Sequence, residues 1–393
     1  MAAIVSLANL TVETPPENFL AAAGGAAWTA APAERLSLRS YSRLDAPGFA
    51  ADSRKAYFAA LGYDAPALKL YRLQNVRFAG TSAAFWIGED LVAESVAHWR
   101  PGPLPDPAEL RAELIRRIGR KPLKLHIPAR RLDGVWLLGA SLYGGNHYHW
   151  HMDLLPAAAL LAELRALAGV KVLVEERTPF VVESLTCLGV AGDDIHVLPS
   201  DAPVLVDQLV FASSFITAGA QLHPRALDSY RAVKARLDLA PVAAPGRRLF
   251  ASRGASERRR PANREQVEAA FAAAGFEVID PGALAYREQA RLFHEADVVV
   301  GEHGANLSNC GFCRPGTLVA ELLHPVRSQL CYLSLAEGLD LLHRSILGVE
   351  DAQGWRLDPD AAVGRVLDAM ARREEHLDRM RALDRVRRKT GSV

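Results

Sequence analysis

The hydrophobic pattern of the C-terminal half alternates between short apolar runs and amphipathic segments. Strands that alternate with helices in this way are typical of a parallel sheet covered by helices. A stretch with two prolines and no charge, residues 240–246, precedes this half and is predicted to be a linker. The pattern after it predicts strands at 248–252, 276–279, 297–300 and 317–320, and helices at 263–274 and 286–295.

The N-terminal half has a similar alternation after a first part rich in Ala, Pro and Gly. It predicts strands at 135–138, 170–174, 195–198 and 204–211, and helices at 106–118, 146–167 and 179–188. A last amphipathic helix is predicted over about 360–388. The expected organisation is an α/β protein with an N-terminal α/β domain at 1–240, a Rossmann-like domain at 245–345 and a C-terminal helical extension at 346–393.

Composition narrows the classes of partner. Of 393 residues half are hydrophobic, and 46 basic against 45 acidic side chains give a formal net charge of +1. Nucleic acid is therefore not expected as a main partner. Four cysteines are too few for a disulfide scaffold and suit a reducing cytoplasm, and Cys310-x-x-Cys313 has no second pair that would complete a zinc site. No signal peptide or transmembrane segment is expected.

A glycine-bracketed histidine follows the predicted strand 297–300. Gly301, Gly304 and Ala305 leave room for a phosphate to approach the backbone, and the helix predicted next would offer free N–H groups around Asn306. Glu321 follows the next apolar run, where parallel sheets bind ligands at strand ends. The pattern favours a nucleotide-phosphate pocket. The alternative is an ordinary strand, turn and helix whose glycines serve packing.

A second group of polar residues opens the predicted helix 146–167. His147 and His151 are four residues apart, as are His149 and Asp153, so each pair shares a helix face. One hypothesis is a metal site on the three histidines. A second is a general base with its neighbour four residues away to orient it. The third is a polar helix start without a chemical role.

Basic residues follow the predicted strand 248–252. Arg253 comes directly after it, and an Arg-rich loop with Arg259 and Arg260 leads to Asn263, a good helix N-cap. Guanidinium groups at this place would neutralise a phosphate. The alternative for the loop is a solvated basic surface.

Two of these segments resemble glycosyltransferase family 61. The first has the family's signature at Gly301, His303, Gly304, Ala305, Leu307, Asn309, Phe312, Pro315, Gly316, Val319 and Glu321. The second is similar at Asn146, Tyr148, His149, Trp150, Asp153 and Pro156. His147 and His151 stand where the family usually has aromatic or aliphatic residues, which weakens the metal hypothesis. The resemblance covers about residues 140–330.

The resemblance implies a metal-independent, inverting hexosyl- or pentosyltransferase with two facing Rossmann-like domains, the GT-B arrangement. It needs no cofactor, because the nucleotide-sugar donor is a substrate; the acceptor would be a glycan or lipid-linked saccharide, for instance in capsular or other surface polysaccharide synthesis. We expect a cytoplasmic protein that can lie at the periphery of the inner membrane. The alternatives are a metal-dependent hydrolase or oxygenase at His147, His149 and His151, and a non-catalytic sugar-nucleotide-binding protein.

The same resemblance assigns residues to roles. Asp153, with His149 as the alternative, would be the catalytic base, and Asn146 and Trp150 would bind the acceptor. Glu321 would bind the donor's ribose hydroxyls. The other expected donor-binding residues are Arg253, Arg259, Arg260, His303, Gly304, Ala305, Asn306 and Asn309.

Overall fold

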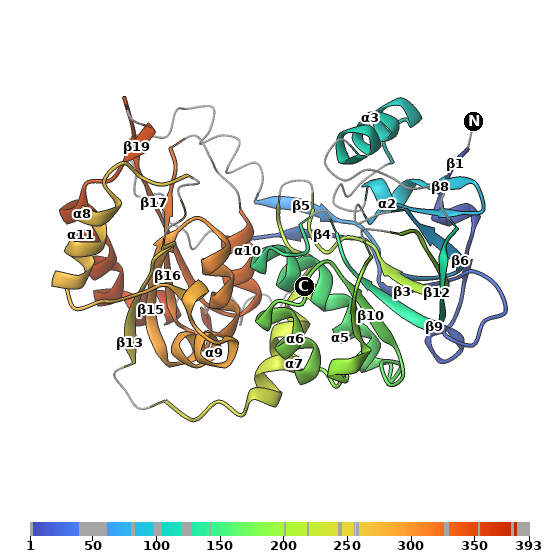
Figure 1. Ribbon diagram of the computed structural model, residues 1–393. Coiled ribbons are helices and arrows are strands. Elements are labelled where there is room, and N and C mark those ends of the chain that lie inside the picture. Colours follow the sequence, from blue (N-terminus) through green and yellow to red (C-terminus); the bar gives the residue numbers. More distant parts are fainter. Residues whose placement is uncertain are drawn as a thin grey trace. The chain divides into compact units, whose positions relative to one another are not determined.

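The computed structural model divides into two compact units (Figure 1). Unit 1 consists of Met1–Leu36 and Asp64–Leu237, and unit 2 of Ser37–Tyr63 and Asp238–Val393. The structure describes residues 3–38, 61–79, 83–97, 104–118, 128–141, 143–199, 202–217, 220–242, 246–254, 256, 259–325, 330–352, 354–378 and 381–382.

Unit 1 is built on a mixed sheet. Its described strands are β1 (Ile4–Val5), β2 (Val12–Glu13), β3 (Ala26–Ala31), β6 (Leu68–Phe78), β7 (Phe85–Ile87), β8 (Asp90–Val92), β9 (Arg130–Gly139), β10 (Lys171–Val174), β11 (Ile195–Val197) and β12 (Val204–Ala212). Their order is β1-β8-β7-β6-β12-β9-β10-β11, with β3 also paired to β6 and β2 to β3. The strands β12, β9, β10 and β11 run parallel, whereas β6 is antiparallel to β12.

Apolar side chains of β6, β9 and β12 form the core of unit 1, which includes Val76, Trp136 and Leu209. The described helices of the unit are α2 (Ala93–Ala97), α3 (Pro107–Ile118), α4 (His147–His149), α5 (Leu155–Glu163), α6 (Pro179–Cys187) and α7 (Asp228–Leu237), with a π-helical turn η3 (Trp150–Leu154) and the 3-10 helices η1 (Leu7–Asn9), η2 (Pro16–Asn18), η4 (Gly192–Asp194) and η5 (Pro224–Leu227). Separately, β4 (Glu34–Ser37) and β5 (Gly62–Ala65) pair with each other.

Unit 2 contains a parallel sheet in the order β14-β13-β15-β16-β17. Its described elements are β13 (Arg247–Ala251), α8 (Arg264–Ala273), β14 (Glu277–Ile279), η6 (Pro281–Ala283), α9 (Tyr286–Glu295), β15 (Ala296–Glu302), the 3-10 helix η7 (Ala305–Phe312), β16 (Leu318–Leu323), α10 (Cys331–Gly338), β17 (Leu342–Leu347), the hairpin β18 (Val349–Asp351) and β19 (Gly354–Arg356), and α11 (Pro359–Ala371).

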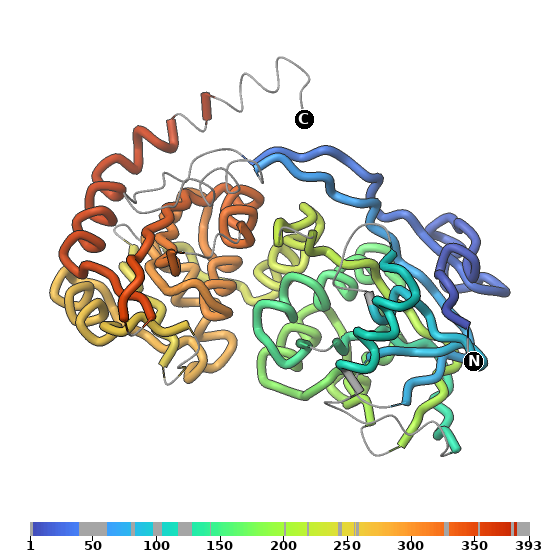
Figure 2. The backbone as a smooth tube through the Cα atoms, turned by 90° about the horizontal axis from the view of Figure 1, so that it is seen from above, coloured from blue at the N-terminus to red at the C-terminus, as the bar shows by residue number. Residues whose placement is uncertain are grey.

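Helices cover both faces of this parallel sheet. On one face α8 and α11 lie side by side (Figures 1 and 2) and pack on Phe250, Val300 and Ala320. On the other face lie α9, η7 and α10. Side chains alternate between the two faces along each strand. Val300 and Glu302 of β15 therefore face α8 and α11, and Val299 faces the opposite way.

The C-terminal segment contributes to the same core. Trp355, Leu357 and Val366 are buried against the α8 and α11 face of the sheet. The described part of the predicted extension 346–393 is thus part of unit 2. The predicted helix 360–388 starts one residue early, and α11 ends at Ala371, where a turn at Arg372 separates it from a further helical stretch. Residues 383–388 of that prediction lie outside the described residues.

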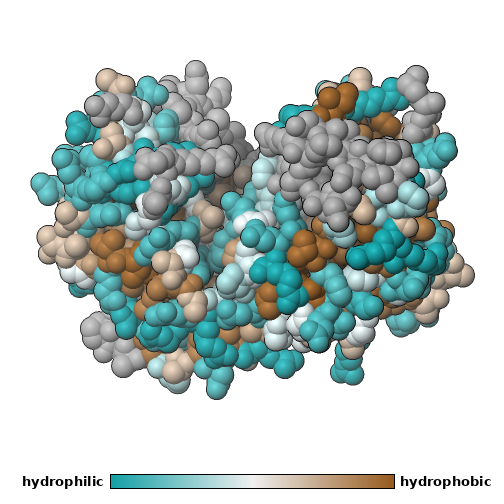
Figure 3. All heavy atoms as spheres, viewed as in Figure 1, coloured by the Kyte–Doolittle hydropathy of each residue, from teal (hydrophilic) through white to brown (hydrophobic). Residues whose placement is uncertain are grey.

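The α/β class predicted from the sequence is confirmed, and most predicted elements appear within a few residues of their expected bounds. The predicted helix 146–167 is instead divided into α4, η3 and α5. The elements of unit 2 that were missed include α10, β17 and the hairpin of β18 and β19. On the face that Figure 3 shows, hydrophilic residues predominate and the apolar ones form scattered patches.

A buried ion pair ties α8 to the end of β15. Arg264 and Glu302 are 3% and 2% exposed, and the guanidinium donates from Nε and Nη2 to the two carboxylate oxygens at 2.6 and 2.9 Å. Nη1 of Arg264 also donates to the carbonyl of Gly254 at 3.0 Å. The pair therefore holds the loop after β13 against the sheet.

Replacing Arg264 with Met should lower the free energy of unfolding by about 3–5 kcal/mol, because Glu302 would keep a buried charge without its partner. The double variant Arg264→Met/Glu302→Met should recover most of that loss. Urea denaturation measures both. As a control, Arg372→Met removes an ion pair to Asp368 whose side chains are 48% and 44% exposed, and it should cost less than about 1 kcal/mol. Equal losses in the two single variants would contradict the prediction.

Candidate functional site

The order of strands in unit 2 creates a topological switch point. The chain starts in β13, moves outward to β14, and returns through α9 to β15 on the other side of β13. Because the two connections leave in opposite directions, the switch point lies at the carboxyl ends of β13 and β15, and open parallel sheets generally bind ligands at such a point. Arg253 follows β13 and His303 follows β15. The switch point thus brings together two residues that the sequence analysis selected.

Arg253 lies directly against Gly304. A Cβ atom placed on Gly304 would be 2.7 Å from Nε and 3.0 Å from Cζ of Arg253, closer than real Cβ atoms come. The backbone of Gly304 is extended, with φ 172°, so the glycine is needed for space and not for its backbone conformation. Gly304 therefore determines the position of the guanidinium.

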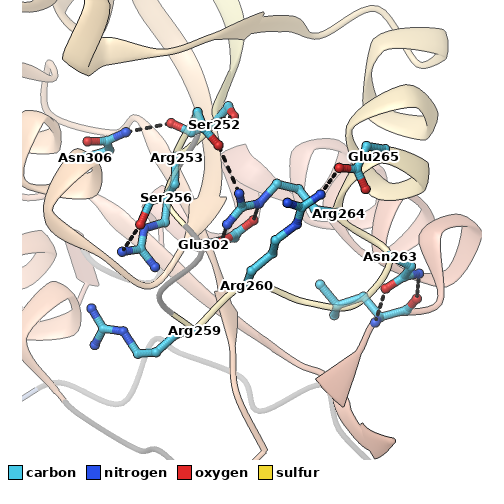
Figure 4. A network of polar contacts seen from close by, with 12 residues as sticks. Ser252, Arg253, Ser256, Arg259, Arg260, Asn263, Arg264, Glu265, Glu302 and Asn306 are labelled. Carbon is cyan, nitrogen blue, oxygen red and sulfur yellow. Dashed lines mark hydrogen bonds and ion pairs between the residues drawn. The ribbon is translucent and has the colours of Figure 1, made fainter. Parts of the chain in front are cut away.

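Further contacts fix the two loops at the switch point (Figure 4). The side-chain amide of Asn306 donates to the carbonyl of Ser252 at 2.6 Å, and Nη2 of Arg253 donates to the Ser256 hydroxyl at 3.3 Å. Burial lowers the pKa of the Arg253 guanidinium, and the positive charge of Arg259 acts in the same direction. A positive charge in these surroundings is stabilised by an anion.

The two other arginines of the loop are placed differently. Arg260 forms an ion pair with Glu265, and its side chain points towards that carboxylate (Figure 4). Arg259 has a left-handed backbone, with φ 62°, and its carbonyl accepts from Trp355 Nε1 at 3.2 Å. Arg258 lies outside the described residues. Of the arginines after β13, Arg253 therefore lies at the switch point, and Arg259 is a positive charge near it.

His303 is held from below by Glu321. Its Nδ1 hydrogen-bonds Oε1 of Glu321, and Oε2 of the same carboxylate accepts from His343 Nε2 at 3.0 Å. Burial by itself would raise the pKa of Glu321, but the charge of His303 and the two hydrogen bonds lower it to about 2. The carboxylate therefore stays ionised between two imidazoles.

The depth of Glu321 changes its expected role. The residue lies inside β16, beside Gly301 of β15, and is 1% exposed. With both oxygens engaged by histidines, it supports His303 and does not present itself to ribose hydroxyls. Asn309 is likewise 1% exposed and donates from its amide to the Asn306 carbonyl at 3.2 Å, so it stabilises η7 from inside. Ala305 and Asn306 are partly exposed at the start of η7.

In unit 1 the second polar group forms an irregular helix start. Pro156 has no N–H to donate four residues back, and Leu155 N–H instead bonds the carbonyl of Trp150, five residues back. The result is the π-helical turn η3, a feature frequent at functional sites. It follows β9 and lies near the segment that follows β12, its parallel neighbour.

Asp153 of this turn is 4% exposed. Its Oδ1 accepts from the Ser214 hydroxyl and from the Phe215 N–H, both at 3.0 Å, so the carboxylate links η3 to the segment after β12. His149 is partly exposed and stacks on Tyr143 with 5.0 Å between ring centroids. Burial lowers the pKa of His149, while the charge of Asp153 acts in the opposite direction. The two proposed bases are thus electrostatically coupled.

Both residues expected to bind the acceptor have structural roles. Trp150 is 1% exposed and donates from Nε1 to the Ser184 hydroxyl at 2.9 Å, so it is a core residue and cannot stack on a sugar. Asn146 is exposed, but its side-chain oxygen caps α4 by accepting from the N–H groups of Tyr148 and His149 at 2.9 and 3.4 Å. The hypothesis for Trp150 was wrong because burial could not be read from its spacing.

The three histidines do not converge. His151 is fully buried, donates from Nδ1 to the His147 carbonyl at 2.9 Å and stacks on Tyr230. Its ring lies 4.1 Å from that of His147, whereas His149 stacks elsewhere. Within the described residues no group of three or more His, Cys, Asp or Glu side chains is arranged to hold a metal ion. The alternative of a metal-dependent hydrolase or oxygenase required His147, His149 and His151 to converge on one ion, and the three side chains do not do so.

Three residues of the two sites were missed in the sequence. His343 and Tyr332 belong to β17 and α10; the ring of Tyr332 lies 5.4 Å from that of His303, and its hydroxyl bonds the Gly304 carbonyl. Ser214 bonds Asp153. The sequence offers no clear signal for His343, because the consecutive polar residues His343, Arg344 and Ser345 interrupt the apolar residues of 341–347.

The polar residues lie after parallel strands in both units, after β13 and β15 in unit 2 and after β9 and β12 in unit 1, as in α/β proteins that bind ligands at strand ends. The family comparison is more specific. Residues 147–320 match the Glycosyltransferase 61 family, a stretch that runs from α4 into β16. This match confirms, for residues 147–320, the family suggested by the sequence motifs. A domain of this family supports glycosyltransferase activity, which requires a sugar donor and an acceptor.

No curated protein matches the chain. Of the helices that the structure describes, none has both the length and the apolar character that a membrane crossing requires.

The buried histidines of unit 1 predict a stability that falls in mild acid. Burial lowers the pKa of His151 from 6.5 to about 4, although its bond to the His147 carbonyl raises it. A folded pKa below the unfolded one favours the neutral form, so this stability is complete above pH 6.5 and is lost as the pH falls towards 4. By linkage, His151 should contribute a loss of about 2 kcal/mol between pH 7.5 and 5.

In His151→Phe, which keeps a ring against Tyr230, that part of the pH dependence should disappear. Urea denaturation at pH 7.5 and 5 measures it. The exposed His196 provides the control, since His196→Phe should leave the dependence as in the wild type. An unchanged loss in His151→Phe would count against the assignment.

Proposed function

We propose that the protein is an inverting glycosyltransferase that binds a nucleotide-sugar donor at the switch point of unit 2. The observation that carries this proposal is the approach of Arg253 to Gly304. It places a desolvated guanidinium beside a glycine that leaves the backbone open, at the start of η7. A departing diphosphate needs such charge and such N–H groups when no metal neutralises it.

The donor's diphosphate would contact Arg253, His303 and the N–H groups of Ala305 and Asn306. The first N–H groups of a helix have no partner inside the helix, so they are available to a phosphate oxygen. Gly301 and Asn306 shape the loop, and Arg259 adds positive charge from nearby. Glu321 and Asn309 support this site from inside.

The acceptor hydroxyl would be activated at the π-helical turn of unit 1. Of the two candidate bases, we favour His149 as the proton acceptor, since it is partly exposed while Asp153 is buried and bonded to Ser214 and Phe215. The lowered pKa of His149 keeps it neutral at pH 7, as a base requires, and Asp153 stabilises the charged form that follows. The sequence analysis had preferred Asp153 as the base, with His149 as the alternative, and the proposal reverses that preference.

The reaction would be a single displacement. The acceptor oxygen attacks the anomeric carbon, its proton passes to His149, and the bond from that carbon to the diphosphate breaks. A single displacement inverts the configuration at the anomeric carbon. In the GT-B arrangement the donor would bind to unit 2 and the acceptor to unit 1. A glycan or lipid-linked saccharide is the acceptor class implied by the family resemblance. Transfer assays with a panel of nucleotide sugars test this against a non-catalytic binding protein.

Gly304→Ala should weaken nucleoside diphosphate binding by about 10-fold or more while the fold remains intact. The new Cβ displaces only the flexible end of Arg253, and loss of one charge-assisted contact is worth about 1.5–3 kcal/mol. Calorimetric titration with UDP and GDP measures the affinity. Gly364→Ala, where an added Cβ meets no atom within 4 Å, is the matched control. Wild-type affinity in a folded Gly304→Ala protein would refute the placement of the donor.

His149→Ala should reduce turnover by roughly 10²-fold or more with donor affinity retained, since a positioned base contributes at least that factor. Asp153→Asn should also reduce turnover, but by a smaller factor, because His149 remains. Steady-state kinetics of the two variants compare these roles. A near-normal His149→Ala beside an inactive Asp153→Asn would return the role of base to Asp153.

A further inference from the structure

A carboxylate lies at the carboxyl end of β14, next to the proposed donor site. Asp280 directly follows Ile279, the last residue of β14, and β14 pairs in parallel with β13. Neighbouring strands of a sheet are about 5 Å apart. Asp280 therefore lies one strand away from the end of β13, which Arg253 follows, on the side of β13 opposite to β15.

The loop after β13 brings its backbone directly against this carboxylate. A Cβ atom placed on Gly254 would be 2.9 Å from Cγ of Asp280 and closer still to Oδ2. Gly254 also has a left-handed backbone, with φ 50°, which glycine adopts without strain. Its N–H donates to the Ser252 hydroxyl at 3.1 Å, and its carbonyl accepts from Arg264 at 3.0 Å. The approach of the loop to Asp280 is thus fixed by contacts on both sides of the glycine.

One oxygen of Asp280 is engaged within the protein and the other is not. Oδ1 accepts from the N–H of Gly282 at 3.0 Å and so caps η6. Oδ2 has no hydrogen-bond or ion-pair partner among the residues that the structure describes, and Asp280 is partly exposed. The side chain therefore offers a ligand an acceptor oxygen that is already held in place.

Two other carboxylates near this edge of the sheet are occupied. Glu302, the last residue of β15, binds Arg264, and Glu321 in β16 bonds two histidines. Both are buried, at 2% and 1% exposure. The ribose-binding role that the sequence analysis gave to Glu321 is therefore left open, and Asp280 has the accessible oxygen that this role requires.

The topology of the sheet and the charge of Asp280 indicate which part of the donor would meet it. In dinucleotide-binding sheets the phosphate lies at the turn after the first strand, and an acidic residue after the second strand accepts from a ribose hydroxyl. β13 and β14 are the first two strands of unit 2 in the same parallel arrangement. A carboxylate repels a phosphate but accepts from a hydroxyl. A hydroxyl beside Asp280 and a diphosphate beside Arg253 satisfy both charges.

We propose that Asp280 binds the ribose of the donor and selects ribonucleoside diphosphate sugars over 2′-deoxyribonucleoside ones. The inference rests on the donor site proposed above. The diphosphate would lie at Arg253 and the start of η7, and the 2′-hydroxyl of the ribose would donate to Oδ2 of Asp280. A 2′-deoxyribose would cover that oxygen without a hydrogen bond, which weakens binding.

Calorimetric titration of the full chain with UDP and GDP, and with 2′-deoxy-UDP and 2′-deoxy-GDP, tests the proposal. At least one ribonucleotide should bind the wild type about 10-fold or more tightly than its 2′-deoxy form, because a hydrogen bond to a charged group is worth at least that factor. This ratio of affinities is a measure that a merely structural role of Asp280 would not change.

Asp280→Ser separates the ribose contact from the cap of η6. Serine keeps a hydroxyl that can accept from the Gly282 N–H, as in many helix caps, but it has no second oxygen. The variant should lose most of the preference for the ribonucleotide, through weaker ribonucleotide binding. It should bind inorganic pyrophosphate, which has no ribose, at least as tightly as the wild type, because a negative charge near the anion has been removed.

Two further variants complete the experiment. Asp358 caps α11 by accepting from the Ala361 N–H at 2.9 Å, so Asp358→Ser is the same change at a similar cap, and it should keep the wild-type preference. Gly254→Ala leaves Asp280 in the chain but displaces its carboxylate, and it should also reduce the preference. Circular dichroism establishes the folding of each variant, and Gly254→Ala serves if Asp280→Ser does not fold.

The outcomes distinguish this inference from the donor site itself. Equal affinity of the wild type for ribonucleotides and 2′-deoxy forms, or a preference that persists in Asp280→Ser, overturns the inference and leaves the donor site in place. Equal losses of pyrophosphate and ribonucleotide affinity in Asp280→Ser overturn it too, since Asp280 would then only support the loop. Failure of UDP, GDP and pyrophosphate to bind the wild type overturns the donor site and the inference with it. A preference that disappears in Asp280→Ser while pyrophosphate binding is retained supports the inference.

Discussion

Two consecutive residues at the end of β15 point to opposite faces of the parallel sheet, and the organisation of unit 2 depends on that alternation. Glu302 faces α8 and binds Arg264, which fixes the loop after β13 through the carbonyl of Gly254. His303 faces the other way and rests on Glu321. A shift of one residue in register would exchange the two acidic environments. The alternation of side chains at the end of β15 thus places the ion pair of Glu302 on one face of the sheet and His303, a residue of the proposed donor site, on the other.

Unit 1 holds its polar group on an irregular turn whose five residues, Trp150–Leu154, are all buried. A regular helix after β9 would have needed the N–H that Pro156 lacks, and the π-helical turn replaces it. Trp150 anchors the turn in the core through Ser184, while Asp153 ties it to the segment after β12. The π-helical turn is therefore held at two points, by the hydrogen bonds of Trp150 and of Asp153. Contacts of this kind keep side chains in a fixed position on a scaffold.

The sequence predicted what depends on local pattern. The alternation of strands and helices after the linker, and the glycines around His303, follow from spacing and backbone space. Burial of polar groups depends on tertiary packing, and there the sequence was insufficient. Trp150 is an aromatic residue of the kind that can stack on an acceptor sugar, but it lies in the core. Glu321 is buried inside β16 and does not reach the expected ligand. In β17 the polar run from His343 to Ser345 concealed a fully buried strand.

The charged groups of the proposed donor site are held by contacts within the protein. Arg253 is held by Gly304 and Ser256, and His303 by a carboxylate whose pKa of about 2 keeps it ionised at every physiological pH. Groups fixed in this way need not reorganise when negative charge develops on a leaving diphosphate, and that preorganisation is the main source of electrostatic catalysis. Glu321 is a negative charge below an anion site, which looks unfavourable by itself. Its two hydrogen bonds to histidines resolve the conflict, because the carboxylate increases the positive charge that the ligand meets.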